Sequence, residues 1–198
     1  MRREGHQGNT KSYRIVKRVL DVVFSAILLS LLVLPMTVIA LLVGMSSDGD
    51  IFFRQRRVGR GGKLFVCYKF RTMTSDAPPN RPSADFFDVE KYLTPIGRFL
   101  RNTSLDELPQ LFNVLRGQMS LVGPRPLIGE EIQIHRLRQD FGVYEVRPGM
   151  TGLSQVNGRT SLSDVQKAAM DERYVKSMSL ATDIKILWRT LFALRVKE

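Results

Sequence analysis

The sequence is poor in the residues that build disulfide frameworks and zinc sites. Its 198 residues include a single cysteine, Cys67, which excludes an internal disulfide and favours a reducing compartment. Cys67 lies among apolar residues, which is typical of a cysteine that is simply a small buried side chain. The two histidines, His6 and His135, lie too far apart in the chain to suggest a zinc site. No glycine-rich loop of the Walker or Rossmann type is present, so these two routes to nucleotide binding are not predicted.

Negative charge is also scarce. The chain has 30 Lys and Arg against 19 Asp and Glu, a net charge of +11 and a pI near 10.2. A balance this basic indicates an anionic partner, which leaves nucleic acid, anionic lipid and a phosphorylated small molecule open. The length and a hydrophobic content of 43% suit one globular domain with one appendage.

One long stretch lacks charge altogether. Residues 22–47 are 26 residues without Asp, Glu, Lys or Arg. As a helix this stretch would be roughly 39 Å long, against a bilayer hydrocarbon thickness of about 30 Å. Signal peptides have shorter apolar regions and a small-residue cleavage site, whereas Asp48 and Asp50 follow here. We therefore expect a membrane segment over residues 1–47 and a second, globular domain over residues 48–198.

Two features favour a helix that enters and leaves the bilayer on one side. Pro35 lies in the middle of the apolar stretch, where it removes a helical hydrogen bond. Arginine and lysine flank the stretch on both sides, and such residues favour the cytoplasmic side. These features predict a re-entrant helix broken at Pro35, with an ordinary kinked span as the alternative.

The rest of the chain predicts an α+β fold that is mostly helical. Residues 51–58 and 63–70 alternate as two strands, and the glycine-rich residues 59–62 between them form a hairpin turn. Helical patterns cover residues 128–141, 163–177 and 181–196, whereas residues 147–152 look like a loop. The last helix is basic and amphipathic with Trp188 on its apolar face. It can lie in the lipid interface or pack on the core.

Two adjacent carboxylates, Asp106 and Glu107, stand just before a further helical pattern. Pro109 restricts where that helix can start, and we expect it to start at Asp106. Carboxylates at a helix start can hold a metal ion or keep one group ionised as a nucleophile. Taken alone, the pair could also be an ordinary acidic helix start.

Several cations and polar residues could bind phosphate. Arg125 lies between two prolines, which stiffen the backbone around a guanidinium that can bind phosphate oxygens bidentately. Residues 151–159 form a polar, glycine-rich stretch of the kind that approaches phosphate closely. Lys69 and Arg71 lie together at the end of the second predicted strand. Each feature, taken alone, is also compatible with a solvated turn, loop or strand edge.

In combination, these motifs resemble the bacterial sugar transferase family, the small monotopic polyprenol-phosphate phosphoglycosyl transferases. The resemblance covers residues 14–194, and its elements occur in the order of the family: Lys17-Arg18 with Asp21, Gln55-Arg56-Arg57-Val58-Gly59, Lys69-Phe70-Arg71-Thr72-Met73, Gly97-Arg98-Phe99-Leu100-Arg101, Ser104-Leu105-Asp106-Glu107-Leu108-Pro109, Gly123-Pro124-Arg125-Pro126, Arg147-Pro148-Gly149, Thr151-Gly152-Leu153 and Gln155-Val156-Asn157-Gly158-Arg159.

The resemblance implies a two-step transfer of a phosphosugar from a UDP-sugar to undecaprenyl phosphate, with UMP released. It implies Asp106 as the nucleophile that carries the phosphosugar and Glu107 as the ligand of Mg²⁺. It further implies substrate contacts at six residues, and contacts with the membrane or the lipid phosphate at three. The substrate residues are Lys69, Arg71, Arg125, Gln155, Asn157 and Arg159, and the membrane residues are Lys17, Arg18 and Pro35.

The implied location is the cytoplasmic face of the bacterial inner membrane, in monotopic form, as the first membrane step of glycoconjugate synthesis. The expected partners are the UDP-sugar, undecaprenyl phosphate and anionic lipid, without nucleic acid, and a homodimer is left open. One departure concerns the helix break, where Leu34 precedes Pro35 and some family members have serine. A binding protein without catalysis and a subunit of a polysaccharide export system are the alternatives.

Overall fold

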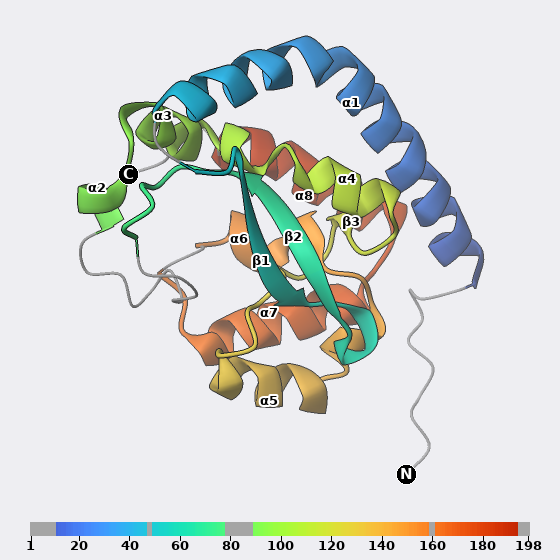
Figure 1. Cartoon of the computed structure of the whole chain (residues 1–198). Helices are drawn as coiled ribbons and strands as arrows, with labels where there is room; N and C mark the ends of the chain where they lie inside the picture. Colours follow the sequence, from blue (N-terminus) through green and yellow to red (C-terminus); the bar gives the residue numbers. More distant parts are fainter. Residues whose placement is uncertain (1–10, 47–48, 78–88, 159–160, 194–198) are drawn as a thin grey trace.

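The computed structural model describes residues 11–46, 49–77, 89–158 and 161–193. Its first element is α1 (Lys11–Ser46), a single helix that contains Pro35. The helix is not interrupted at Pro35, contrary to the predicted break. It arches over one side of the body instead (Figure 1). Among the described residues, α1 is the one helix long and apolar enough to cross a membrane.

The two faces of α1 differ sharply. Met36, Ile39 and Val43 are buried against Phe70 and Leu100 of the body. On the outer face Leu31 and Leu34 are each 71% exposed, in a helix whose polar residues are few. An apolar face this large has no partner within the described part of the chain, and such patches mark contact surfaces.

The predicted hairpin is confirmed. β1 (Phe52–Val58) and β2 (Leu64–Phe70) pair antiparallel, and the tip between them is the short 3₁₀ turn η1 (Arg60–Gly62). Gly61 and Gly62 have φ of 67° and 74°, a left-handed conformation that glycine adopts at little cost. Phe65 and Cys67 of β2 point inward, against Val114 and Met119. Lys69 shares that inward face by alternation along the strand.

A second, smaller sheet was not predicted. β3 (Ser120–Val122) and β4 (Gly149–Thr151) pair in parallel, where the sequence indicated a loop over residues 147–152. The two backbones approach closely, because a Cβ on Gly149 would lie 2.1 Å from the nitrogen of Gly123. Strands of only three residues are too short to show an alternating pattern, and β4 begins with glycine, so the sequence contains no signal of this sheet.

Helices surround the two sheets, and the predicted helices of the second half are present with shifted ends. They are α2 (Val89–Tyr92), α3 (Pro95–Thr103), α4 (Gln110–Leu115), α5 (Ile132–Asp140), α6 (Leu153–Val156), α7 (Asp164–Lys176) and α8 (Leu180–Ala193), with 3₁₀ turns η3 (Leu105–Glu107) and η4 (Val143–Glu145). α7 begins with a capping box in which Ser163 and Gln166 bond reciprocally. α5 and α7 lie at the end of the hairpin away from the middle of α1 (Figure 1).

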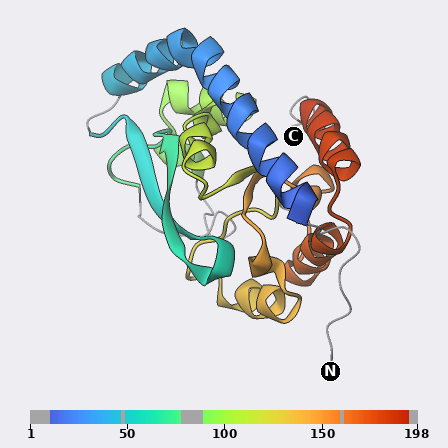
Figure 2. The ribbon, with the colours of Figure 1, turned by 90° about the vertical axis from the view of Figure 1, so that its right-hand side faces the viewer.

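The last helix, α8, turns its apolar side chains outward. Ile186 is buried, whereas Ile184, Trp188 and Leu191 are 66%, 63% and 59% exposed. The sequence left open whether the apolar face of this helix lies in the lipid interface or packs on the core. Packing on the core is wrong for Ile184, Trp188 and Leu191. α8 lies beside the first turns of α1 (Figure 2). Their contact includes the ion pair of Lys17 Nζ with Asp183 Oδ2, at 2.7 Å.

Candidate active site

The two adjacent carboxylates lie in the turn η3, between α3 and α4. The predicted helix start at Asp106 is wrong by a few residues, since α4 begins at Gln110 with Pro109 as its N-cap. Ser104 links α3 to the turn with φ of 59°, an uncommon value for a residue other than glycine. The turn is closed by hydrogen bonds from Glu107 N to Ser104 O and from Leu108 N to Leu105 O.

The two carboxylates have different surroundings. Glu107 Oε1 accepts a hydrogen bond from Lys69 Nζ at 2.7 Å, and both side chains are partly exposed. Asp106 is 8% exposed, and its charge interacts electrostatically with Arg101. The sequence did not single out Arg101 for the site. Burial lowers the pKa of the Arg101 guanidinium, and the charge of Asp106 partly offsets this. Adjacent acids are thus divided between a buried and a more accessible position.

Glu107 borders a narrow cleft, which we call the cleft from here on. Its lining includes Arg57, Lys69, Glu107, Gln110, Arg125 and Gln155. Burial lowers the pKa of the Arg57 guanidinium, and the like charge of Arg125 lowers it further. Arg57 belongs to a quoted motif but was not predicted as a site residue, because a strand arginine gives no signal of which way it points. The cleft has a free volume of about 10 Å³. Three cations around one carboxylate at its mouth give it a positive charge that would attract a polyanion such as a diphosphate.

Arg125 is presented by a buried stretch of backbone. Gly123, Pro124 and Pro126 are buried, and Arg125 between them is half-buried at the cleft. The stretch is held against β4 by hydrogen bonds from Gly149 N to Pro124 O and from Gly123 N to Thr151 O. The prolines and these bonds fix the backbone before any ligand arrives, as the sequence predicted for a stiffened arginine.

The other predicted substrate residues do not all reach the cleft. Gln155 lines it and donates from Nε2 to Met150 O at 3.0 Å. The structure places Asn157 on the surface, where Nδ2 bonds Leu153 O and Oδ1 accepts from Arg189. Arg71 donates to Gly49 O, next to the end of α1, and does not belong to the lining of the cleft within the described residues. Arg159 lies outside the described residues.

The predicted lipid-phosphate residues have partners inside the protein. Lys17 is paired with Asp183, and Arg18 donates to Val114 O at 2.6 Å and Leu115 O at 2.9 Å. Arg18 therefore caps the C-terminal end of α4, where unpaired carbonyls favour a cation. Both side chains anchor α1 to the body, and their role at lipid phosphate stays a prediction.

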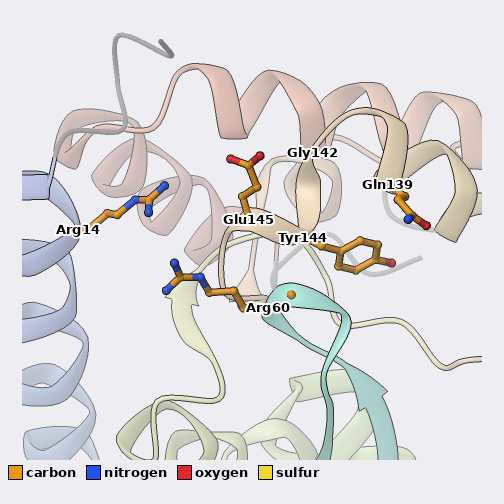
Figure 3. A pocket seen from close by; sticks show the side chains of 7 residues that line it. Arg14, Arg60, Gln139, Gly142, Tyr144 and Glu145 are labelled. Atoms are coloured by element: carbon orange, nitrogen blue, oxygen red, sulfur yellow. The ribbon is translucent and has the colours of Figure 1, made fainter. Parts of the chain in front are cut away.

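A larger cavity of about 470 Å³ lies elsewhere, at the tip of the hairpin (Figure 3). We call it the tip pocket. Its lining includes Arg14, Arg60, Gln139, Gly142, Tyr144 and Glu145, and Figure 3 shows that Arg14 and Arg60 extend toward the space beside Glu145 from α1 and from the hairpin. It contains no adjacent carboxylates, so its size alone does not make it the reactive site.

The acidic pair fits one kind of metal site. Within the described residues, no group of three or more His, Cys, Asp and Glu side chains could hold a metal ion unaided. Mg²⁺ is commonly held by one or two carboxylates together with substrate phosphates and water. Glu107 supplies a carboxylate of this type at the cleft, and Asp106 is its neighbour in the turn η3. The residues therefore suit a magnesium ion completed by a bound diphosphate.

The fold and the site together define a protein that combines a polyanion cleft and an acidic pair with a long, exposed apolar helix. The chain belongs to the bacterial sugar transferase family, whose model matches residues 12–197.

Among its relatives, undecaprenyl-phosphate galactose phosphotransferase of Salmonella typhimurium is 41% identical, over 91% of this chain and 40% of the relative. UDP-glucose:undecaprenyl-phosphate glucose-1-phosphate transferase of Klebsiella pneumoniae is 39% identical, over 90% of this chain and 40% of the relative. Exopolysaccharide production protein ExoY of Sinorhizobium fredii is 37% identical, over 89% of this chain and 84% of the relative. The chain thus spans about two fifths of the length of the first two.

Proposed function

We propose that this protein transfers a phosphosugar from a UDP-sugar to undecaprenyl phosphate, giving undecaprenyl diphosphosugar and UMP. The observation that carries the proposal is the division of two adjacent carboxylates, one buried beside Arg101 and one at the edge of a cationic cleft. Membership of the family and the activities for which the Salmonella and Klebsiella relatives are named support it.

In the first step a carboxylate oxygen of Asp106 attacks the sugar-linked phosphorus of the UDP-sugar. A bond forms between this oxygen and phosphorus, the bond from phosphorus to the bridging oxygen breaks, and UMP leaves with that electron pair. In the second step a phosphate oxygen of undecaprenyl phosphate attacks the same phosphorus. The bond to Asp106 breaks and the carboxylate is regenerated, so one nucleophile serves both halves of the reaction.

The cleft supplies charge for these steps. Arg57, Lys69 and Arg125 are placed to offset the negative charge of the diphosphate and of the departing UMP. Glu107 would hold Mg²⁺, which when bound neutralises phosphate charge and polarises the phosphoryl group. Lys69 holds Glu107 in the orientation seen here.

We further propose that the protein lies on the cytoplasmic face of the inner membrane. The apolar faces of α1 and α8 support a membrane location, because Leu34, Ile184 and Trp188 on these faces are 71%, 66% and 63% exposed. The re-entrant course of α1 remains part of the proposal: both basic flanks would stay on the cytoplasmic side, and the arch of α1 would take the place of a sharp break at Pro35.

Cysteine labelling tests this course. Ser12→Cys and Asp50→Cys, placed singly in a Cys67→Ser background, lie at exposed positions on either flank. We expect both to react with a membrane-impermeant thiol reagent in inverted vesicles and neither in intact spheroplasts. Reaction of the two positions from opposite sides would contradict re-entry and support a simple span.

The experiment that tests the activity is release of UMP. The full chain in detergent or membranes is given Mg²⁺, undecaprenyl phosphate and a panel of UDP-sugars, and the sugar that supports release identifies the substrate. A binding protein without catalysis would bind anions in a salt-sensitive way and release no UMP. An export subunit would show neither behaviour, so one assay separates the three classes.

A further inference from the structure

The loop that carries Arg125 is held by bonds from outside the loop. Residues 125–128 belong to no helix or strand, yet each carbonyl from Pro124 to Ile128 has a hydrogen-bond partner. The partners are Gly149 N for Pro124, Arg138 Nη1 for Arg125, Arg57 Nη1 for Pro126, Val58 N for Leu127 and His135 Nε2 for Ile128, at 2.7 to 3.0 Å. The backbone that carries Arg125 is therefore held partly by side chains that lie outside the loop.

One of these partners is deeply buried. Arg138 of α5 is 3% exposed and donates from Nη1 to the Arg125 carbonyl at 2.8 Å. Its Nη2 lies 2.5 Å from Asp171 Oδ2 of α7, which is fully buried. The guanidinium thus uses two different nitrogens, Nη2 for the ion pair with Asp171 and Nη1 for the loop.

The other oxygen of Asp171 bonds the helix that carries Gln155. Ser154 Oγ of α6 donates to Asp171 Oδ1 at 2.9 Å. The next residue, Gln155, also lines the cleft. Arg138 and Asp171 themselves do not belong to the lining. A single buried pair therefore ties together the two segments that supply Arg125 and Gln155.

Burial of such a pair needs an explanation other than stability. Removing two charges from water costs about as much as their attraction returns, and apolar side chains of similar volume are often as good. The geometry offers one, because an apolar pair could not bond the Arg125 carbonyl and the Ser154 hydroxyl.

We propose that Arg138 and Asp171 are positioning residues, which set the spacing of Arg125 and Gln155 for the nucleotide diphosphate. This inference rests on the proposed function of the cleft and adds to it two residues that touch no substrate.

The test is a double-mutant cycle on the full chain. Arg138→Lys keeps the positive charge opposite Asp171, but a lysine cannot span two acceptors with a planar fork. We expect the KM for the UDP-sugar to rise about tenfold, since small misplacements of binding groups are costly. In an Arg125→Ala background the same change should leave KM within about twofold, because its effect passes through Arg125.

Ile134→Val is the matched control. It lies on the same helix, is buried, and loses only packing. We expect it to lower Tm without raising KM. If Arg138→Lys does not fold, Ser154→Ala replaces it in a parallel cycle with Gln155→Ala, with a smaller rise in KM that vanishes in the Gln155→Ala background.

Two kinds of failure are distinguishable. If the wild type releases UMP but Arg138→Lys raises KM equally in both backgrounds, or raises it no more than Ile134→Val, the positioning role is overturned and the proposed function stands. If the wild type neither binds UDP in calorimetry nor releases UMP from any UDP-sugar, the proposed function fails and the positioning role with it.

Discussion

The cleft and the tip pocket contain similar side chains but hold them differently. Each has two arginines near a glutamate: Arg57 and Arg125 with Glu107 in the cleft, Arg14 and Arg60 with Glu145 in the tip pocket. In the tip pocket both arginines and the glutamate are exposed.

In the cleft the three side chains are half-buried, on backbone fixed by hydrogen bonds. The comparison teaches that the smaller hollow is the prepared one, because preorganised charge acts more strongly where water is excluded.

The largest effect is expected from replacing Asp106, the proposed nucleophile beside the cleft residue Glu107. Asp106→Asn preserves shape but removes the nucleophile, so we expect turnover to fall on the order of 10⁴-fold or more. Incubation with labelled UDP-sugar in the absence of undecaprenyl phosphate should leave a labelled adduct on the wild type and none on the variant. An adduct that survives in Asp106→Asn would refute the assignment.

A matched pair of arginine variants tests the two hollows directly. Arg125→Ala removes a charge placed at the diphosphate, and we expect kcat/KM to drop about a hundredfold. Arg60→Ala removes an exposed charge in the tip pocket and should change kcat/KM by less than about twofold. Equal losses in UMP-release assays would show that the comparison between the hollows is mistaken.

A second matched pair concerns the glutamates. Glu107→Gln should raise the Mg²⁺ concentration needed for half-maximal rate by about tenfold or more, because a carboxylate ligand is lost. Glu145→Gln, in the tip pocket, should leave the Mg²⁺ titration unchanged. A titration that is the same for Glu107→Gln and wild type would remove Glu107 from the metal site.

The smallest effect concerns the reactivity of Cys67, which lines the cleft. Cys67 is 3% exposed, and burial raises the pKa of its thiol above the ordinary value. The thiolate fraction at neutral pH is therefore below that of a free cysteine, and alkylation should accelerate only at more alkaline pH. Gln139→Cys in a Cys67→Ser background, at the exposed tip pocket, should be alkylated rapidly. Rapid alkylation of native Cys67 at neutral pH would show that the cleft opens.

Local patterns predicted much of the fold. The uncharged stretch indicated α1, and the glycines at the hairpin tip indicated the β1–β2 turn, because both signals come from neighbours in the chain. The parallel pairing of β3 with β4 was missed, since its register depends on the close approach of Gly123 and Gly149 from distant parts of the chain. The uninterrupted course of α1 through Pro35 also reflects packing against the body.

The candidate site divides in the same way. The sequence indicated the acidic pair, Lys69, Arg125 and Gln155, which the structure brings to one region. It did not indicate Arg57 and Arg101, whose relevance depends on which way a strand or helix turns them. The sequence predicted contacts of Lys17 and Arg18 with lipid phosphate. It did not predict their contacts inside the protein, with the Asp183 carboxylate and with carbonyls at the end of α4.

By itself, the sequence determined the residue types and their order: a basic chain, an apolar helix, an acidic pair before a proline, and an arginine between prolines. Those features are local, and local chemistry fixes them. Only the tertiary structure decided which carboxylate is buried and which faces the cleft. It also decided that the buried Arg138–Asp171 pair links the segment of Arg125 to the helix of Gln155, because such a link forms only when distant segments pack together.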